Sequence, residues 1–377
     1  MAALLGLLVN PVAGMGGRVG LHGTDGPRRL AEARRRGAVP VTAPRARRAV
    51  QRFAGRDLAI LAAPGPMGAD VATASGVPVQ AVDLEIGPET TPADTEHAAR
   101  LLADAGAALL LFAGGDGTAG DIINAVGRAV PILGIPSGVK MRSGVFAPSP
   151  EMAGDLAAEF IGRADRRVTT AEVLDAVEGG GPEGLGGSVG VEFRGLASVP
   201  SLGADRLPGA KTSTLLASSA VLDAMCRAVA AELTPGTLYL FGPGTTTGMI
   251  LGALGLPSSP LGIDAVKDGA LVGTDVGEEA IIELMDQAPL TKLVLGVIGG
   301  QGFLLGRGNQ QLSAAVLSRL GPDDLIIVSA PDKLVALQPP LLRIDVGDDV
   351  SFPWPAGYRR VRVGPSRFMM MRVSGAA

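Results

Sequence analysis

The feature that most constrains this chain is a recurring pattern: a short apolar run, a glycine-rich turn, and then apolar residues at helical spacing. The pattern is clearest over residues 109–124, LLLFAGGDGTAGDIIN. It is typical of a buried strand, a turn whose amides can approach a phosphate, and a helix whose N-terminus faces the same point. A carboxylate, Asp116, stands in the middle of this turn. Because Asp116 would repel a bound phosphate, we expect it to hold a cation or to take a proton from an attacking hydroxyl group.

The same pattern recurs through the N-terminal part of the chain. Apolar runs predict short buried strands over residues 4–9, 58–62, 79–82 and 132–135. Ala and Leu at helical intervals predict a helix that begins near Thr91 and Pro92. This alternation indicates a largely parallel sheet with helices on both faces. Ligands bind such sheets at the carboxyl ends of the strands, where the glycine turns would lie.

The second half of the chain begins differently and then returns to the pattern. Two strand-like segments and an Ala-rich helix are expected over residues 168–173, 188–193 and 213–233. Three further apolar runs, each ending in a glycine-rich or polar turn, follow at residues 237–241, 293–298 and 325–328. The dipeptide Asp268-Gly269 predicts a hairpin.

These patterns predict an α/β protein with two domains. We place an N-terminal parallel α/β domain over residues 1–160 and a second, mixed α/β domain with a β-rich connecting region over residues 161–350. Residues 351–377 are set apart as a C-terminal extension.

Composition excludes several classes of function. A net charge of -4 argues against nucleic acid as the main partner, and the arginine-rich segments 28–36 and 45–52 are interpreted as solvated helix faces. No apolar run approaches the roughly 18 residues that a membrane span requires. The two histidines are too few for a His-rich metal site, and the single cysteine, Cys226, is expected to be a packed thiol in a reducing cytoplasm. There is no Walker A motif and no convincing Ser/His/Asp constellation.

Seven motifs in order carry a resemblance: NPVAGMGG, GLHGTDG, GGDGT, GIPSGVKM, GPGTTT, GGQGFLLGRGNQQLS and SAPDKL. Together they resemble the ATP-NAD kinase-like family that includes the AcoX proteins, from about residue 6 to about residue 345. GGDGT alone is shared with diacylglycerol and sphingosine kinases and phosphofructokinases. The resemblance implies an NAD kinase-like fold and the transfer of a phosphoryl group from ATP or inorganic polyphosphate to the 2′-hydroxyl of the adenosine ribose of NAD, giving NADP.

The resemblance also implies roles for individual residues. Asp116 would be the catalytic carboxylate, acting as a base or through Mg²⁺, and Asp25 is a second candidate metal ligand. The other candidate nucleotide- or phosphate-binding residues come from all seven motifs: Asn10, Gly14, Gly16, Gly17, Thr24, Asp25, Gly114, Gly115, Gly117, Thr118, Lys140, Arg142, Gly242, Gly244, Thr245, Thr246, Gly300, Gln301, Asn309, Gln310, Asp332 and Lys333. The expected partner is a small nucleotide such as NAD, without nucleic acid or membrane, and a homo-oligomer is expected.

The chain differs from the family pattern at three positions near the expected site. The family usually has Lys at His22, a longer polar or basic residue at Gly120 and His at Arg142. Replacing a Lys with a largely neutral His removes a fixed charge beside phosphates, which would suit a different ligand. Three alternatives therefore stay open: a kinase of the same superfamily with another nucleotide, nucleoside or sugar as acceptor, a lipid kinase, and a nucleotide-binding regulatory protein without catalysis.

Overall fold

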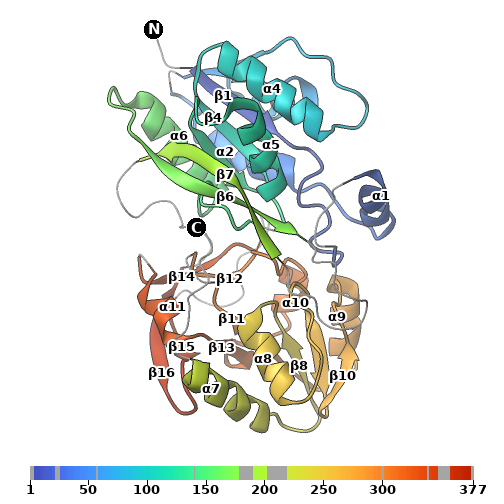
Figure 1. Ribbon diagram of the computed structural model, residues 1–377. Helices are drawn as coiled ribbons and strands as arrows, with labels where there is room; N and C mark the ends of the chain where they lie inside the picture. The colour runs from blue at the N-terminus through green and yellow to red at the C-terminus, as the bar shows by residue number, and fades with distance from the viewer. Residues whose placement is uncertain are drawn as a thin grey trace. The chain divides into compact units, whose positions relative to one another are not determined.

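The computed structural model describes residues 4–21, 26–56, 58–139, 141–177, 190–201, 219–298, 301–337, 339–346 and 357–374. The chain divides into two compact units. Unit 1 comprises Met1–Gly16, Gly23–Ala176 and Val191–Ala210, and unit 2 comprises Gly17–His22, Val177–Gly190 and Lys211–Ala377. Each unit is an α/β structure built on its own large sheet (Figure 1).

The described residues of unit 1 form a five-stranded parallel sheet in the order β3-β2-β1-β4-β5. Its strands are β1 (Leu4–Val9), β2 (Ala59–Ala62), β3 (Val79–Ala81), β4 (Ala107–Gly114) and β5 (Ile132–Pro136). These are the four predicted N-terminal strands and the strand of the GGDGT stretch, so the parallel sheet expected from the sequence is confirmed. The strand order reverses direction between β1 and β4, which makes this the switch point of the sheet.

Helices cover both faces of this sheet (Figure 1). They are α2 (Thr42–Gln51), α3 (Ala69–Ala74), α4 (Pro92–Asp104), α5 (Asp116–Val126) and α6 (Pro150–Gly162). A further helix, α1 (Pro27–Arg35), contributes no residue to the core clusters on these two faces. Successive side chains of a strand point to opposite faces, so Leu109 and Leu111 pack with α2, α3 and α6, whereas Leu110 and Phe112 pack with α4 and α5. A strand buried on both faces must be apolar throughout, which is why residues 109–113 read as one continuous run.

One expectation about the arginine-rich segments is wrong at a single residue. The segments form α1 and α2, and most of their arginines are exposed or pair with acidic residues at the surface. Arg45, however, is buried on α2 and its Nε donates a hydrogen bond to the carbonyl oxygen of Pro136. The packing of α2 against the sheet and α6 turns this residue toward the end of β5.

The predicted β-rich connection is also present. Strands β6 (Val168–Val177) and β7 (Gly190–Pro200) form a two-stranded sheet among the described residues. Val173, Ala197 and Val199 pack into the same core cluster as Phe112. The two strands therefore cover part of the side of unit 1 that also holds α4 and α5.

The described residues of unit 2 form a nine-stranded mixed sheet in the order β10-β9-β8-β11-β13-β15-β16-β14-β12. Its strands are β8 (Thr237–Phe241), β9 (Asp264–Lys267), β10 (Ala270–Gly273), β11 (Leu290–Gly296), β12 (Phe303–Leu305), β13 (Leu325–Val328), β14 (Leu341–Ile344), β15 (Gly357–Arg362) and β16 (Phe368–Val373). The predicted hairpin joins β9 to β10, and both Asp268 and Gly269 have the positive φ that such a turn requires. The segment set apart as a C-terminal extension contributes β15 and β16, which are inner strands.

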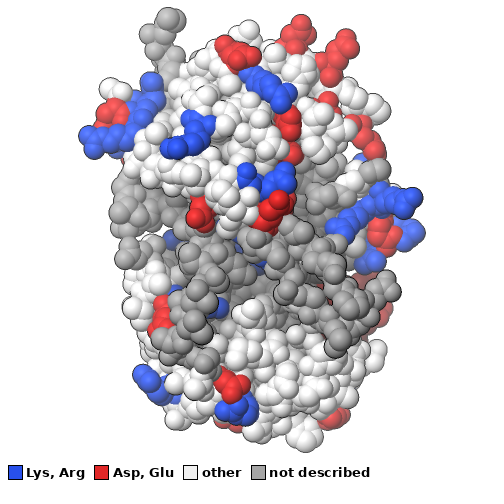
Figure 2. Space-filling model, in the orientation of Figure 1, with Lys and Arg blue, Asp and Glu red and all other residues white. Residues whose placement is uncertain are grey.

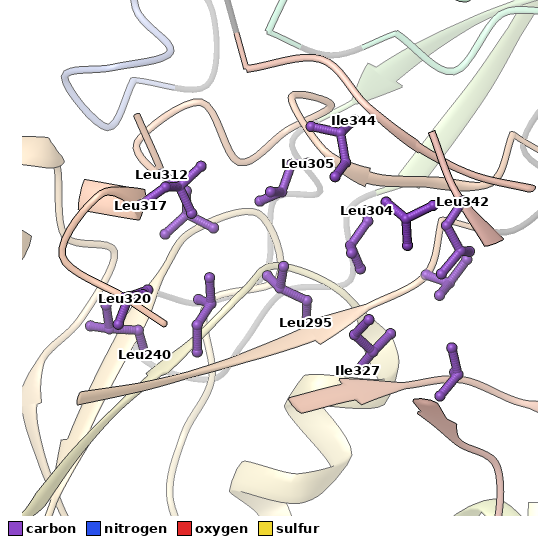
Figure 3. Packing of buried hydrophobic residues seen from close by; sticks show 14 of the residues in the cluster. Leu240, Leu295, Leu304, Leu305, Leu312, Leu317, Leu320, Ile327, Leu342 and Ile344 are labelled. Carbon is purple, nitrogen blue, oxygen red and sulfur yellow. The ribbon is translucent and has the colours of Figure 1, made fainter. Parts of the chain in front are cut away.

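Two core clusters lie on the two faces of this sheet. One contains residues of α7 (Ser219–Ala231) and α8 (Thr245–Ala253), including Cys226, whose thiol is buried as expected and whose pKa burial raises to about 11. The other joins α9 (Glu278–Asp286), α10 (Ala314–Leu317) and α11 (Pro331–Val335) to the opposite face. Figure 3 shows Leu240, Leu295 and Ile327 of the sheet beneath Leu312 and Leu317 in this second cluster.

No helix in the described part of the chain is long and apolar enough to cross a membrane. On the face drawn in Figure 2, basic and acidic side chains are interspersed rather than gathered by sign.

Candidate functional site

The switch point of the unit 1 sheet brings together two of the predicted motifs. The loop after β1 contains Asn10, and the turn after β4 leads into α5, which contains Thr118. The Asn10 side-chain amide donates to Oγ1 of Thr118 at 3.0 Å, and the Asn10 backbone N–H donates to the Ala113 carbonyl at 2.9 Å. Two candidate residues separated by more than 100 positions in sequence are therefore hydrogen-bonded to each other.

Asp116 is the first residue of α5 and is only 2% exposed. Its carboxylate accepts three hydrogen bonds from the loop that follows β5. The backbone N–H of Arg142 donates to Oδ2 at 2.6 Å, while the backbone N–H and the hydroxyl of Ser143 donate to Oδ1 at 3.0 and 2.6 Å. The side chain thus ties the start of α5 to the β5 loop.

Burial controls the protonation of this carboxylate. Loss of solvent around Asp116 disfavours the charged form and raises its pKa to about 6. The hydrogen bonds from Ser143 and Arg142 oppose this rise, and the negative charge of Asp175 adds to it. A carboxylate with a pKa in this range is largely ionised at neutral pH and is still basic enough to accept a proton. The arrangement suits a general base.

Ser143 is a residue to which the sequence gives no role, although it lies two residues after the GIPSGVKM stretch. It is buried, its hydroxyl donates to Asp116, and the same oxygen accepts from the backbone N–H of Leu174 at 3.0 Å. Ser143 therefore links the carboxylate to β6. A hydroxyl in a loop after a buried strand was the only available signal, because its partners lie 27 and 31 positions away.

Of the two predicted cations in the loop after β5, the structure describes Arg142. Lys140 lies outside the described residues. Arg142 is buried, and desolvation lowers the pKa of its guanidinium, while the charges of Asp116 and Asp175 favour its charged form. A buried cation beside a buried carboxylate reduces the electrostatic cost of both charges.

Two glycines of unit 1 are required by packing. A Cβ at Gly14, which has a φ of +76°, would lie 1.9 Å from the Ser137 carbonyl oxygen. A Cβ at Gly114 would lie 2.5 Å from Oγ1 of Thr118. These positions bring the loops after β1, β4 and β5 close together. Of the other predicted glycines here, Gly16 is buried, Gly115 precedes α5 as its N-cap, and Gly117 is exposed.

The turns of unit 2 follow the carboxyl ends of its parallel strands. After β8, Gly242 packs against Leu295, and Gly244 is the N-cap of α8. Thr245 is exposed and Thr246 is buried, while the next hydroxyl, that of Thr247, donates to the Gly244 carbonyl at 2.9 Å. That hydroxyl stabilises the turn itself.

The GRGNQQ stretch is folded around one amide side chain. Asn309 is buried, its Oδ1 accepts from Gly306 N–H at 2.7 Å, and its Nδ2 donates to the Leu304 carbonyl at 3.0 Å. Gln310 donates to the Gly306 carbonyl and lies against Gly17. The loop therefore uses one hydrogen-bonding position at each end of the Asn309 amide.

Other polar residues of unit 2 were not singled out by the sequence. Arg18 forms an ion pair with Glu278 at 2.8 Å, and Ser313 also donates to Glu278. Hydrogen bonds from Arg18 and Ser313 favour the charged form of Glu278 and its pKa is lowered, although burial opposes this. These contacts hold the segment after Gly17 against the start of α9.

The remaining described candidate residues differ in how deeply they are buried. Gln301 is buried, Asp332 is exposed, and burial lowers the pKa of Lys333. His22, Thr24, Asp25 and Gly300 lie outside the described residues. Within the described ranges, no group of three or more His, Cys, Asp or Glu residues could hold a metal ion.

Two family models match this chain. The ATP-NAD kinase N-terminal domain matches residues 5–164, and the ATP-NAD kinase C-terminal domain matches residues 236–373. No curated protein and no solved structure matches it. The first match contains the Asp116 network and the second contains the whole nine-stranded sheet. Taken with the fold of the two units, these matches show that the chain belongs to the ATP-NAD kinase family and is an NAD kinase-like phosphotransferase.

Proposed function

We propose that this protein transfers a phosphoryl group from ATP or inorganic polyphosphate to the 2′-hydroxyl of the adenosine ribose of NAD, giving NADP. The observation that carries the proposal is the buried carboxylate of Asp116, which begins α5 at the switch point and has a pKa of about 6. Ligands of open α/β sheets bind at this point. The seven ordered motifs support the same activity and favour the AcoX branch of the family.

In the proposed step the hydroxyl oxygen forms a bond to the terminal phosphorus of the donor. The bond between that phosphorus and its bridging oxygen breaks, and the bridging oxygen leaves with ADP or the shortened polyphosphate. The hydroxyl proton passes to Asp116. Oδ2 of Asp116 accepts one hydrogen bond and Oδ1 accepts two, so Oδ2 is the oxygen with a lone pair left for the proton.

A magnesium ion fits this site through few protein ligands. Mg²⁺ usually binds one or two carboxylates and completes its coordination with water and substrate phosphates. Asp116 offers the one remaining lone pair of Oδ2, and Asp25 is the second proposed ligand. Mg²⁺ held in this way would neutralise charge on the donor phosphates. Because one lone pair cannot bind both a proton and a cation, Asp116 acts either as the base or as a ligand.

A kinase with a different acceptor is the second candidate, and Arg194 favours it. A Cβ at Gly120 on α5 would lie 3.7 Å from Nε of Arg194, which belongs to β7. A cation therefore approaches this turn of α5 from another strand, whereas the family usually carries a longer polar or basic residue on α5 itself. A positive charge that comes from β7 instead of α5 would favour a different phosphoryl acceptor.

The proposal extends to partners and location. We propose a small-molecule enzyme that forms a homo-oligomer, acts on neither nucleic acid nor membranes, and works in the cytoplasm. The buried thiol of Cys226 and the net charge of -4 support the compartment and the exclusion of nucleic acid. Analytical ultracentrifugation of the full chain tests the oligomer.

The test of the activity is product formation from defined substrates. The purified chain is incubated with Mg²⁺ and either ATP or polyphosphate, together with NAD or a panel of nucleotides, nucleosides and sugars, and products are identified by mass spectrometry. NADP formation with stoichiometric ADP is the expected result. Turnover of another acceptor with none on NAD would keep the phosphotransferase and reject NAD, while binding of NAD or ATP without any product would favour a regulatory protein.

A further inference from the structure

A cleft of about 560 Å³ lies within unit 2, beside the β15–β16 hairpin. Its volume falls in the range of about 300–1,000 Å³ that is typical of small-molecule sites. We call it the hairpin cleft. Its lining includes Glu232, Lys292, Asp323, Tyr358, Arg360 and Phe368.

The hairpin cleft lies at the amino ends of the parallel strands of unit 2. It is lined by Thr234 just before β8, by Lys292 early in β11 and by Leu325 at the start of β13. The predicted GPGTTT, GGQGF and APDK turns follow the other ends of the same strands. The cleft is therefore separate from the edge of the sheet that carries the motifs, and no motif explains it.

Among the described residues, α7 contributes Val229 to the lining of the cleft and α8 contributes none. Helices α7 and α8 pack mainly over β8, β9 and β11 in the core cluster on this face. Tyr358, Phe368 and Met370 of the hairpin remain 64%, 44% and 57% exposed. Large apolar side chains that lie together at a surface commonly mark a binding site.

The basic residues that line the cleft are Lys292, Arg359, Arg360 and Arg362, and Arg359 donates a hydrogen bond to the Tyr358 carbonyl oxygen. The guanidinium of Arg362 already has protein partners. It donates two hydrogen bonds to the Glu232 carboxylate, which lower the pKa of that carboxyl, and one to the Gly364 carbonyl. Arg360 instead lies over the Phe368 ring at 4.0 Å. Among the described residues no carboxylate forms an ion pair with Arg360 or Lys292. Glu232 is paired with Arg362, so Asp323 is the other acidic residue in the lining of the cleft.

We propose that the hairpin cleft binds a small anion that carries a planar ring, such as an aryl phosphate. Arg360 and Lys292 would contact the anionic group, and the ring would stack on Tyr358 and the Arg360–Phe368 layer. Arginine combines both functions because its guanidinium donates hydrogen bonds to oxyanions and stacks on aromatic faces. The site lies outside the proposed catalytic region and does not depend on the proposed kinase activity.

The test uses phenyl phosphate as the probe and isothermal titration calorimetry on the full chain. Arg360→Glu is expected to weaken binding by at least tenfold, and Tyr358→Ala by roughly threefold. The matched control is Arg372→Glu, because Arg372 pairs directly with Tyr358 across the hairpin, is exposed and does not line the cleft. Cyclohexyl phosphate, which has no planar ring, is expected to bind more weakly than phenyl phosphate, and benzoate separates carboxylate from phosphate recognition.

Several outcomes would overturn the proposal. Absence of phenyl phosphate binding at millimolar concentration would do so, as would binding that survives Arg360→Glu. Equal weakening by Arg372→Glu would reduce the effect to the overall charge of the hairpin. A change of oligomeric state in Tyr358→Ala, measured by ultracentrifugation, would assign this face to contact between copies instead. NADP formation measured in parallel keeps a failure of this proposal distinct from a failure of the proposed kinase.

Discussion

The Asp116 site in unit 1 and the hairpin cleft in unit 2 place charge in opposite surroundings. Asp116 is 2% exposed and receives three hydrogen bonds, whereas Tyr358 and Phe368 of the cleft are 64% and 44% exposed. In a dry site each hydrogen bond changes the pKa of the buried group, because water cannot compensate for its loss. In an open cleft, water and salt screen each charge, so affinity depends on the sum of several contacts. In our proposals, the first site accepts a proton and the second recognises a ligand.

The largest effect that would test this contrast is expected from Asp116→Asn. The amide keeps the volume of the side chain but cannot act as a base, so kcat/KM for phosphoryl transfer should fall by about 100-fold or more. Steady-state assays of ADP release measure it. Asp104→Asn is the control, because Asp104 ends α4 in an exposed position. Activity of Asp116→Asn within a few-fold of wild type would contradict the catalytic role.

The rigidity of the unit 1 edge is tested by Gly14→Ala. A positive φ costs a residue with a Cβ about 1–2 kcal/mol, and the clash with the Ser137 carbonyl adds an overpacking cost of about 1–3 kcal/mol. A loss of about 2–5 kcal/mol should appear as a lower Tm in calorimetry. Gly162→Ala, at the end of α6 with nothing within 4 Å of its Cβ, should leave Tm nearly unchanged. A mild Gly14→Ala variant would show that this loop moves freely.

A smaller effect is expected from Ser143→Ala. In the wild type, activity should rise with pH through about 6, as Asp116 loses its proton. The Ser143 hydrogen bond favours the charged carboxylate, so its removal should raise the pKa of Asp116 and move this acidic limb to higher pH. A loss of about 1.4 kcal/mol is about tenfold in the acid dissociation constant, so kcat/KM at pH 6 should fall about fivefold. The kcat/KM profile from pH 5 to 8 measures both.

Ser143→Thr is the matched control for this shift, because it retains the hydroxyl group. Its acidic limb should lie closer to that of the wild type than the limb of Ser143→Ala does. If both variants lose activity equally at every pH, Ser143 acts on folding of the loop and not on the carboxylate.

The smallest effect concerns salt. Raising KCl from 50 to 500 mM shortens the screening length, so phenyl phosphate binding in the hairpin cleft should weaken roughly three- to tenfold. The acidic limb set by Asp116 should stay in place, because its charge is buried. Calorimetry and pH profiles at the two salt concentrations make the comparison. An equal response at the two sites would show that Asp116 is more exposed to solvent than its burial indicates.

Local patterns in the sequence were sufficient to predict much of the fold. The apolar runs that became β1, β4, β5, β8 and β13 are short and end in glycine or polar turns, and the Asp268-Gly269 hairpin depends on two adjacent residues. Each of these signals is local, because the run of apolar residues and the turn residues that end it are adjacent in the chain. The motifs by themselves also identify Asn10, Asp116 and Thr118 as candidate site residues.

The tertiary structure alone decided how those residues are used. It paired Asn10 with Thr118, buried Asp116 under the backbone of Arg142 and made Ser143 its hydrogen-bond partner. It also placed Oδ1 and Nδ2 of Asn309 in hydrogen bonds to the backbone of its own loop. The hairpin of β15 and β16, which the sequence separated as an extension, became part of the sheet and one wall of a cleft. These contacts join residues that are far apart in the chain, so no local sequence pattern could encode them. The burial that raises the pKa of Asp116 depends on all of these contacts at once.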